Sequence, residues 1–403
     1  MRICKVWDAD YPWDVRVEKV ADSLIAAGHE VHLVCRNLAR RDRCESNGNL
    51  TIHRLPVVSA KFGPIHGLWN FPYPVNPVWI HSMDRVIREA QVDLILVRDL
   101  LLALPAAILA KIHRIPVILD MAENYPAMLQ DRLRYTPSGL LGRLVRHPSP
   151  IRLVERLSLA LVDHIIVVVE ESRERLVGAG VPSDRITIVC NTPRLEGWQA
   201  AASRQNCPRS KQDIHLAYLG NLDGSRGLDV AIRAVHRLKD AGRFVKLSIM
   251  GNGPSREQLT ALATHSGVAD RVEITGRLPF SQVTEVMAQA DIGLIPHYAT
   301  AAWNSTIPNK LFDYMALGLP VIVSDTKPTA RIVRKEQCGE VFRDRNETDL
   351  ARCIVALADP KARRTQGENG QAAIARLYNW NYDSQILVRT LEAVRASVQT
   401  NWS

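Results

Sequence analysis

Hydrophobic positions along the chain fall into short continuous runs separated by amphipathic segments. Residues 1–10 are typical of a strand, residues 15–28 of an amphipathic helix that Gly28 ends, and residues 30–35 of a second strand. A strand, a helix and a strand in this order predict a β-α-β unit. Because the strands are rich in Val, Ile and Leu throughout, we expect a parallel sheet covered by helices on both faces.

This alternation occurs twice, with one interruption. In the first half it predicts further strands at residues 92–98, 115–123, 164–170 and 186–191, and helices at residues 104–113 and 172–180. Residues 196–213 are polar, contain a proline and lack periodicity, so we interpret them as a linker. The alternation restarts at residue 214, and beyond Pro360 the pattern is helical. The sequence therefore predicts two Rossmann-like α/β domains, 1–195 and 214–375, and a helical segment, 376–403, that returns toward the first domain.

Size and composition narrow the class of protein. The 403 residues suffice for two cored domains, and no run of 18 apolar residues occurs. The N-terminus lacks the apolar stretch of a signal peptide, and the seven cysteines show no CxxC or His/Cys spacing for zinc. We expect a cytoplasmic protein, soluble or peripheral, with reduced thiols. The net charge of +9 is spread over both halves, which argues against a dedicated nucleic-acid arm.

One basic and apolar stretch suggests a surface partner. Between Arg132 and Arg156, six arginines face one carboxylate, Glu155, and alternate with Leu, Val and Tyr. This composition suits an anionic membrane surface on the inner membrane face. The aromatic stretch at residues 67–82 suits the same partner, although a buried loop explains it equally well.

Two loops of the second half have the composition of phosphate-binding loops. Gly220, Gly224 and Gly227 permit close backbone approach after the strand at 214–220, and Arg226 offers a guanidinium suited to bidentate phosphate contact. A surface turn with a solvated arginine is the alternative. The second loop, around Gly251, supplies two of the three glycines of a GxGxxG fingerprint, which a simple turn also explains.

A third loop is the most informative. After Pro308 a helix begins near Asn309, so that the amides of Asn309 to Leu311 and the ammonium of Lys310 are candidates to bind a diphosphate. Asp313, one turn further, can accept hydrogen bonds from both ribose hydroxyls of a nucleotide. An ordinary first-turn carboxylate is the alternative for Asp313.

The segment PNKLFDYMALGLPVIVSD resembles the donor-site segment of family 4 glycosyltransferases, which have the GT-B fold of two facing Rossmann-like domains. GHEVHLV, DRITIVCNTP, LGNLDGSRGLD, MGNGP and ITGRLP follow in the order expected of that family, over nearly the whole chain. The resemblance implies retaining transfer of a sugar from a nucleoside diphosphate sugar, without a required metal, in the cleft between the domains. A branch with Pro-x-Lys before the ribose acid is similar and is often linked to bacterial surface polysaccharides.

By resemblance, Arg226 binds the donor diphosphate, Asp313 the ribose, and the loop of Gly276, Arg277 and Leu278 lies beside the base. The donor-binding residues implied altogether are Trp13, Asp14, Gly220, Asn221, Arg226, Gly251, Gly276, Arg277, Leu278, Ser305, Thr306, Pro308, Asn309, Lys310, Leu311 and Asp313.

Three positions depart from the family. Ser305 stands where the family often has a sugar-binding glutamate, Asn221 where many members have a second phosphate-binding arginine, and Asp313 where the ribose acid is usually Glu. The nucleotide contacts are therefore better supported than the sugar contacts. Arg226 and Lys310 remain as the cations of the site.

In the first domain, YPWDVRVEK resembles the loop whose backbone, at Trp13 and Asp14, approaches the donor phosphate, with Arg16 starting a helix. An N-cap is the alternative role for Asp14. In LDMAENYP, Asp120 and Glu123 match the family's Asp-x-His-Glu, while Ala122 replaces the histidine. Glu123 is therefore the candidate to orient or deprotonate an acceptor hydroxyl, unless it is a salt-bridged structural residue.

The predicted acceptor-binding residues are Arg16, Arg98, Asp120 and Glu123. Arg98 and its neighbour Asp99 follow a strand and point toward the expected cleft, but they are equally explained as one ion pair.

The sequence therefore predicts a retaining, metal-independent hexosyltransferase whose catalytic residues are Glu123, Arg226 and Lys310. The co-substrate is a nucleotide sugar, with uridine as the default base, and the acceptor is a glycan or a polyprenyl-diphosphate-linked sugar. We expect front-face attack, with the leaving phosphate taking the acceptor proton, since no carboxylate pair suggests a covalent nucleophile. A nucleotide-sugar epimerase of the same fold and a catalytically weak nucleotide-sugar-binding scaffold remain alternatives, whereas the incomplete glycine fingerprint makes an oxidoreductase a poorer fit.

Overall fold

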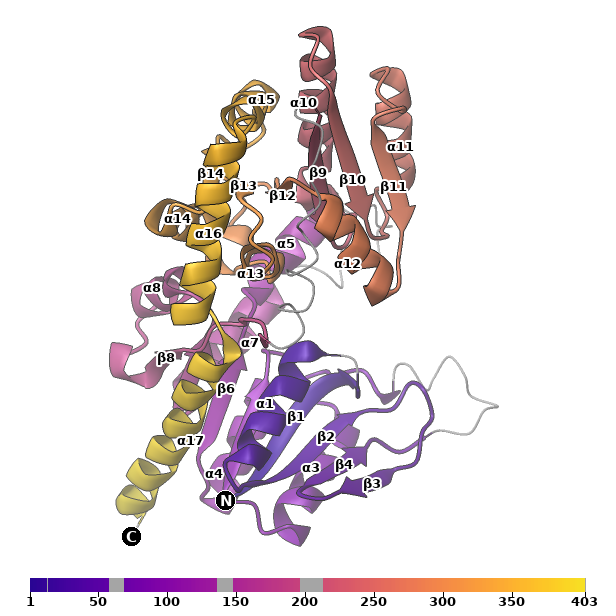
Figure 1. Ribbon diagram of the computed structural model, residues 1–403. Coiled ribbons are helices and arrows are strands. Elements are labelled where there is room, and N and C mark those ends of the chain that lie inside the picture. Colours follow the sequence, from indigo (N-terminus) through magenta and orange to yellow (C-terminus); the bar gives the residue numbers. More distant parts are fainter. Residues whose placement is uncertain (13, 58–68, 136–147, 196–212, 403) are drawn as a thin grey trace. The chain divides into compact units, whose positions relative to one another are not determined.

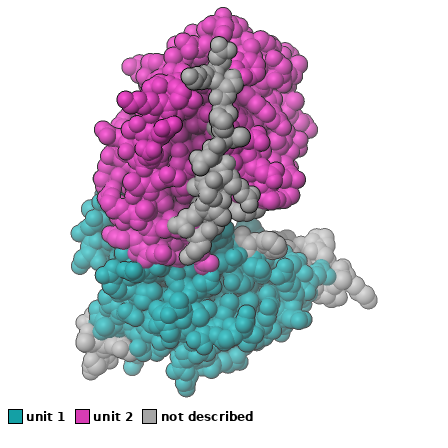
Figure 2. All heavy atoms as spheres, in the orientation of Figure 1, with its two compact units in different colours: residues 1–126, 148–191, 383–403 teal, residues 127–147, 192–382 magenta. Residues whose placement is uncertain are grey.

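The computed structural model describes residues 1–12, 14–57, 69–135, 148–195 and 213–402. The chain divides into two compact units (Figure 2). The first comprises the described residues within Met1–Pro126, Pro148–Asn191 and Asp383–Ser403, and the second those within Ala127–His147 and Thr192–Tyr382. Helix α5 (Tyr125–Tyr135) and helix α17 (Trp380–Trp402) each contain residues of both units.

The described residues of the first unit form a sheet in the order β3-β4-β2-β1-β5-β6-β7-β8, parallel in every pair except β3–β4. Its strands are β1 (Arg2–Asp10), β2 (Glu30–Arg36), β3 (Cys44–Asn47), β4 (Leu50–Arg54), β5 (Leu94–Arg98), β6 (Val117–Met121), β7 (His164–Val167) and β8 (Ile186–Ile188). The helices are α1 (Val15–Ala26), α3 (Pro77–Glu89), α4 (Ala103–His113), α7 (Pro148–Leu161) and α8 (Glu170–Gly178), with the 3-10 helix η2 (Ser183–Arg185).

Local signals explain where helix α1 begins and ends. The carboxylate of Asp14 accepts a hydrogen bond from the amide of Val17 at 2.8 Å and so caps the first turn. At the other end Gly28 has a φ of +81°, and the amide of His29 bonds back to the carbonyl of Leu24 at 3.0 Å. The predicted end of the helix at Gly28 is confirmed.

The described residues of the second unit form a fully parallel sheet in the order β11-β10-β9-β12-β13-β14 (Figure 1). Its strands are β9 (Ile214–Leu219), β10 (Val245–Met250), β11 (Val272–Gly276), β12 (Ile292–Ile295), β13 (Val321–Ser324) and β14 (Gly339–Phe342). The helices are α10 (Leu228–Asp240), α11 (Arg256–His265), α12 (Phe280–Gln289), α13 (Lys310–Ala316), α14 (Lys327–Glu336), α15 (Glu347–Ala356) and α16 (Pro360–Arg376), with the 3-10 helices η3 (Gly224–Arg226) and η4 (Trp303–Ser305).

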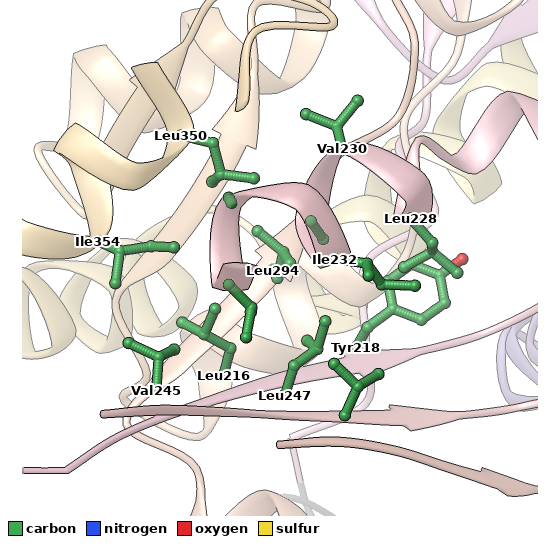
Figure 3. Close-up of a cluster of buried hydrophobic side chains, with 14 of the residues drawn as sticks. Leu216, Tyr218, Leu228, Val230, Ile232, Val245, Leu247, Leu294, Leu350 and Ile354 are labelled. Atoms are coloured by element: carbon green, nitrogen blue, oxygen red, sulfur yellow. The ribbon is translucent and has the colours of Figure 1, made fainter. Parts of the chain in front are cut away.

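The core of the second unit fixes the sheet beneath helix α10. Leu216 and Leu247, from β9 and β10, are fully buried in one cluster with Ile232 of α10, and α15 contributes Leu350 and Ile354 to it (Figure 3). At about 25 cal/mol per Å² of apolar surface, burying one such side chain stabilises the fold by about 1.5–3 kcal/mol. This packing holds the carboxyl ends of β9 and β10 in place.

The strand order determines where a ligand binds in the second unit. β9 lies in the middle of the sheet, and successive strands are added on one side as far as β11 and then on the other side from β12. In open α/β sheets, ligands bind outside the carboxyl ends of the strands at this switch point. The loops that begin at Gly220 and Pro296 follow β9 and β12 and therefore flank the expected crevice.

Candidate functional site

Arg226 lies at the end of η3, in the loop that follows β9. Its Nε donates to Oδ2 of Asp223 at 2.8 Å, and its guanidinium carbon lies 4.4 Å from the centre of the Trp303 ring. Trp303 is held in turn by a hydrogen bond from its Nε1 to Oγ of Ser225 at 3.1 Å. Within the described residues the two terminal nitrogens of Arg226 have no partner. They present the fork that binds phosphate oxygens bidentately.

Asp223 organises this turn. Its Oδ1 accepts from the amide of Ser225 at 3.0 Å while its Oδ2 holds Arg226. Burial would raise the pKa of Asp223, but the Arg226 charge and the bonds from Ser225 outweigh it and hold the pKa below its usual value. The carboxylate thus stays ionised and keeps the guanidinium oriented.

Lys310 is the second cation of the site. It begins helix α13, is only 8% exposed, and places Nζ 3.8 Å from the centre of the Tyr218 ring. Burial, followed by repulsion from Arg226, lowers the pKa of Lys310 well below its usual value. A side chain at Gly220 would place its Cβ 2.7 Å from Nζ, so the lysine occupies the space that this glycine leaves. We call Arg226 and Lys310 the cation pair.

His297 completes the surroundings of Lys310. It directly follows Pro296 after β12, is buried, and has Nε2 3.5 Å from Nζ of Lys310. Its ring lies 4.2 Å from that of Trp303, centre to centre. Burial, and then the charges of Lys310 and Arg226, lower the pKa of His297 well below its usual value, so the imidazole is neutral.

Neither His297 nor Trp303 was predicted from the sequence. The signal that could have found His297 is its position directly after the strand at the switch point.

Glycines allow three loops at this edge to touch. The amide of Gly251 donates to the carbonyl of Gly276 at 2.8 Å, and a Cβ at Gly251 would lie 1.8 Å from the carbonyl oxygen of Gly220. The loops after β9, β10 and β11 therefore meet, and their role in donor binding stays a prediction. Arg277 is exposed and Leu278 half-buried beside them.

The loop before α13 contains the remaining predicted donor residues. Ser305, Thr306, Pro308 and Leu311 are buried, Asn309 is exposed at the start of the helix, and Asp313 is half-buried in its first turn. The Ser305 hydroxyl donates to the carbonyl of Ala301, inside the turn. In the loop after β9, Asn221 is exposed and donates to Asp223 at 3.3 Å.

The end of helix α5 packs on the turn of residues 223–227, which carries Arg226. A Cβ at Gly224 would lie 3.2 Å from Cβ of Tyr135, and the Tyr135 hydroxyl accepts from Arg345 at 2.8 Å. One turn earlier, Asp131 accepts from the Thr300 hydroxyl at 2.6 Å. These residues were missed by the sequence analysis, because they are distant in sequence from every loop of the site.

In the first unit three of the four predicted acceptor residues, Arg16, Arg98 and Asp120, form an interior ion network. Both side-chain oxygens of Asp120 accept from Arg16, the shortest contact being 2.6 Å, and Arg98 reaches Asp120 at 3.4 Å and Asp99 at 3.5 Å. Burial opposes ionisation of Asp120, yet the charges of Arg16 and Arg98 hold its pKa well below the usual value. Arg16 and Asp120 are almost completely buried, and the structure shows them as an ion pair with each other. Their acceptor contact stays a prediction.

Other first-unit predictions have separate outcomes. Asp14 has the N-cap geometry that was one of its two interpretations, and Glu123 is half-buried after β6. Trp13 lies outside the described residues. Asp8, which was not predicted, is a further acidic group here, because burial and then the charge of Asp99 raise the pKa of Asp8 to about 7.

The fold and these loops define a class of protein, the GT-B glycosyltransferases. The sucrose-phosphate synthase of Thermosynechococcus elongatus has the same fold, with a TM-score of 0.77 and 18% identity over 98% of this chain and 99% of that one. Anabaena Alr3699/HepE, solved in complex with UDP, has a TM-score of 0.69 and 14% identity over 98% of this chain and 100% of that one.

Family models identify the relatives more closely. Residues 14–192 match the Glycosyl transferase 4-like domain, and residues 213–359 match Glycosyl transferases group 1. Together they include well over half of the chain, which therefore belongs to glycosyltransferase family 4.

Two curated relatives act in bacterial polysaccharide synthesis according to their names. The amylovoran biosynthesis glycosyltransferase AmsK of Erwinia amylovora is 25% identical over 47% of this chain and 46% of its own length. The putative colanic acid biosynthesis glycosyltransferase WcaL of Escherichia coli K12 is 24% identical over 41% of this chain and 47% of its own length. The matches thus span about half the length of these relatives.

Proposed function

We propose that this protein is a retaining glycosyltransferase that transfers a sugar from a nucleoside diphosphate sugar, with UDP-sugars favoured, to a glycan or a polyprenyl-diphosphate-linked acceptor in surface-polysaccharide synthesis. The observation that carries the proposal is the cation pair at the switch point between β9 and β12. AmsK and WcaL support the pathway class by their names, and HepE, solved with UDP, supports the base.

The cation pair suits the chemistry of the leaving group. When the bond from the sugar to the diphosphate breaks, the diphosphate gains negative charge. Arg226 offers two terminal nitrogens that have no partner in the described part of the chain. Lys310 offers an amine that is largely screened from water, where electrostatic stabilisation is strong. Catalysis without a metal and front-face attack by the acceptor are parts of this proposal.

The test is the exchange of one arginine. Arg226→Ala should lower kcat/KM by about 10²- to 10³-fold, because an oriented charge partner of the leaving group is lost. Arg237→Ala, an exposed arginine on α10, is the matched control and should leave the rate unchanged. The donor is first chosen from a panel of nucleotide sugars by thermal stabilisation, and turnover is then followed with membrane lipid extract, with and without EDTA. An Arg226→Ala rate within a few-fold of wild type would contradict the electrostatic role.

Product analysis separates this function from its two alternatives. Ser305 stands where the family often has a sugar-binding glutamate, and its buried hydroxyl donates to the carbonyl of Ala301, so an epimerase or a binding scaffold remains a competitor. An epimerase would convert the nucleotide sugar without any acceptor, whereas a scaffold would bind UDP with no turnover. A transferase requires the acceptor.

Peripheral attachment to an anionic membrane belongs to the same proposal. Within the described residues no helix is long and apolar enough to span a bilayer. Helices α4 and α7 pack together and expose four apolar side chains, Ile108 (48%), Ile112 (66%), Leu153 (58%) and Leu157 (42%). We call these four residues the α4–α7 face.

The charges around the α4–α7 face favour an anionic lipid surface. Arg152 and Arg156 are exposed on α7 beside its leucines. Glu155, the one carboxylate between Arg132 and Arg156, is paired with Arg175 at 2.9 Å. Trp79, from the aromatic stretch that suggested the same partner, is fully buried, and Arg143 and Arg146 lie outside the described residues.

Vesicle flotation tests this attachment. Wild type should float with phosphatidylglycerol vesicles and not with phosphatidylcholine vesicles, and Leu153→Gln/Leu157→Gln should reduce flotation at least about tenfold, since apolar area and charge both contribute. Val177→Gln alters a comparably exposed apolar residue on α8 of the same unit and should float like wild type. Equal flotation with both lipids would remove the membrane from the proposal.

A further inference from the structure

The surroundings of Lys310 are unusual for an ammonium group. The titratable or charged groups that face it are Tyr218 on β9, Asp223 and Arg226 in the turn at η3, His297 after β12, and Asp313 on α13. None of the carboxylates in the described part of the chain lies within ion-pair distance of Nζ. The Tyr218 ring favours a charged amine, but burial and the neighbouring guanidinium oppose it.

His297 is placed to stabilise the uncharged amine. Its Nε2 lies 3.5 Å from Nζ, and its Nδ1 is buried with no partner among the described residues. An imidazole that carries its proton on Nε2 donates it to the lone pair of a neutral amine. The ring is held for this contact against Trp303, which also supports Arg226.

We propose that His297 is a positioning residue of the donor site, which keeps Lys310 as a neutral amine while the site is empty, so that Lys310 takes up one proton from solvent when a nucleoside diphosphate binds. This inference rests on the proposed function, because it requires a diphosphate at the cation pair. The proton balance is simple: Nζ gains one proton from water or buffer, and no covalent bond of the ligand changes.

The bound diphosphate adds negative charge close to Nζ, in addition to Asp223 and Asp313, which lie beyond ion-pair distance. In the empty site, burial and Arg226 hold the pKa of Lys310 well below its usual value, and a diphosphate between the two cations raises it. Between the two pKa values only the complex holds the proton, so affinity falls as pH rises through that window. For the uptake of one proton, the steepest possible dependence is a Kd that weakens about tenfold for each pH unit.

Calorimetry of UDP binding in buffers of different ionisation enthalpy measures this uptake. At pH 8 the terminal phosphate of UDP, with a second pKa of about 6, is already ionised and contributes no proton. Wild type should take up close to one proton. Lys310→Arg should bind UDP with almost none, because a guanidinium stays charged. Lys335→Arg, the same exchange at an exposed lysine of α14, should behave like wild type.

His297→Phe tests the positioning role, since it retains a ring against Trp303 but removes the N–H. In this variant the pKa of Lys310 in the empty site should rise, so that more of the amine is already charged at pH 8. The proton uptake on UDP binding at pH 8 should therefore fall by at least half. A purely structural role for His297 would alter the melting temperature or Kd and leave the uptake unchanged.

A direct measurement does not depend on any variant being fully functional. In protein labelled at lysine 13Cε, the Lys310 signal, assigned by its loss in Lys310→Arg, should report a neutral amine at pH 8 and an ammonium after UDP is added. UDP binding without proton uptake, or an ammonium signal in the empty site, would overturn the inference alone. If UDP, GDP and ADP all failed to bind the wild type, the donor site itself would be refuted.

Discussion

Gly227 shows how tightly a single residue of the turn that carries Arg226 is constrained. Its φ is +63°, and an added Cβ would lie 1.9 Å from the carbonyl oxygen of Pro296. Both observations call for glycine, one because of the backbone conformation and the other because another loop approaches. The residue therefore joins the loops after β9 and β12, which are the two that flank the switch point.

Gly227→Ala should destabilise the protein by about 2–4 kcal/mol, since it adds a backbone clash to the left-handed conformation. Gly242→Ala is a matched control, because Gly242 also has a positive φ, +73°, but nothing lies within 4 Å of its Cβ position. It should cost only about 1 kcal/mol. Urea denaturation measures both, and equal losses would mean that the contact with Pro296 is unimportant.

At this scale the sequence predicted residues whose type is itself informative. The sequence could identify candidate phosphate-binding residues, because a glycine next to a lone cation suits a phosphate site. The structure brings together three of them, Gly220, Arg226 and Lys310. The sequence could not identify Tyr218 and Trp303 as site residues, because aromatic residues beside apolar runs are ordinary core residues. Only the fold places their rings against Lys310 and Arg226. Arg16 and Asp120 lie 104 positions apart, so their pairing is invisible in the sequence.

Helix α5 is the element whose role depends most on tertiary structure. Its C-terminal part belongs to the second unit and packs within that unit through Asp131 and Tyr135, on two successive turns of the helix. Tyr135 covers Gly224 at the start of the turn that carries Arg226. The helix therefore limits the freedom of that turn before any ligand binds, which lowers the cost of ordering it on binding.

Tyr135→Ala should weaken UDP binding by about three- to tenfold, because the turn loses its cover and must be ordered by the ligand. Tyr135→Phe removes the bond from Arg345 and keeps the ring, so its Kd should change less than about twofold. Calorimetric titration with UDP distinguishes them. If the two variants bound equally, the ring would have no part in holding the turn.

Element prediction succeeded where burial on both sheet faces produces continuous apolar runs. The strands β1, β5, β6 and β9 all occur where such runs predicted strands. β3 was not predicted, because its four residues are exposed and carry no apolar alternation. β14 was also missed, since Gly339–Phe342 is short and contains a glutamate, and its pairing with β13 defines it.

At the scale of the whole molecule, the chain passes between the two units several times. Helix α17 begins with Trp380 in the second unit and continues from Asp383 in the first. There Asp383 accepts from the amide of Cys190 at 3.0 Å, Arg395 reaches Asp93 at 2.6 Å, and Leu387 and Leu391 are fully buried. The first unit therefore draws part of its core from the far end of the described chain.

Leu391→Ala should destabilise the first unit by about 2–5 kcal/mol, the usual cost of removing a buried leucine side chain. Arg389→Ala, on the exposed side of the same helix, should stay within about 0.5 kcal/mol of wild type. Scanning calorimetry measures the unfolding transition of each unit. Added UDP should stabilise the second unit and so separate its transition from that of the first unit. The lower-melting transition alone should shift in Leu391→Ala, and a shift of the UDP-dependent transition instead would contradict this assignment.

The path of helix α17 also sets an order of events during synthesis. The second unit has all its described segments once Tyr382 has left the ribosome, whereas the first unit still lacks the helix that carries Leu387 and Leu391. At about 5–20 residues per second, roughly 10–40 s separate the appearance of Asn191 from that of Asp383. During that interval the nascent first unit has an open apolar seam. A chaperone that binds exposed apolar surface would therefore bind the N-terminal half of this protein first. That half is synthesised first but is the last to complete its core.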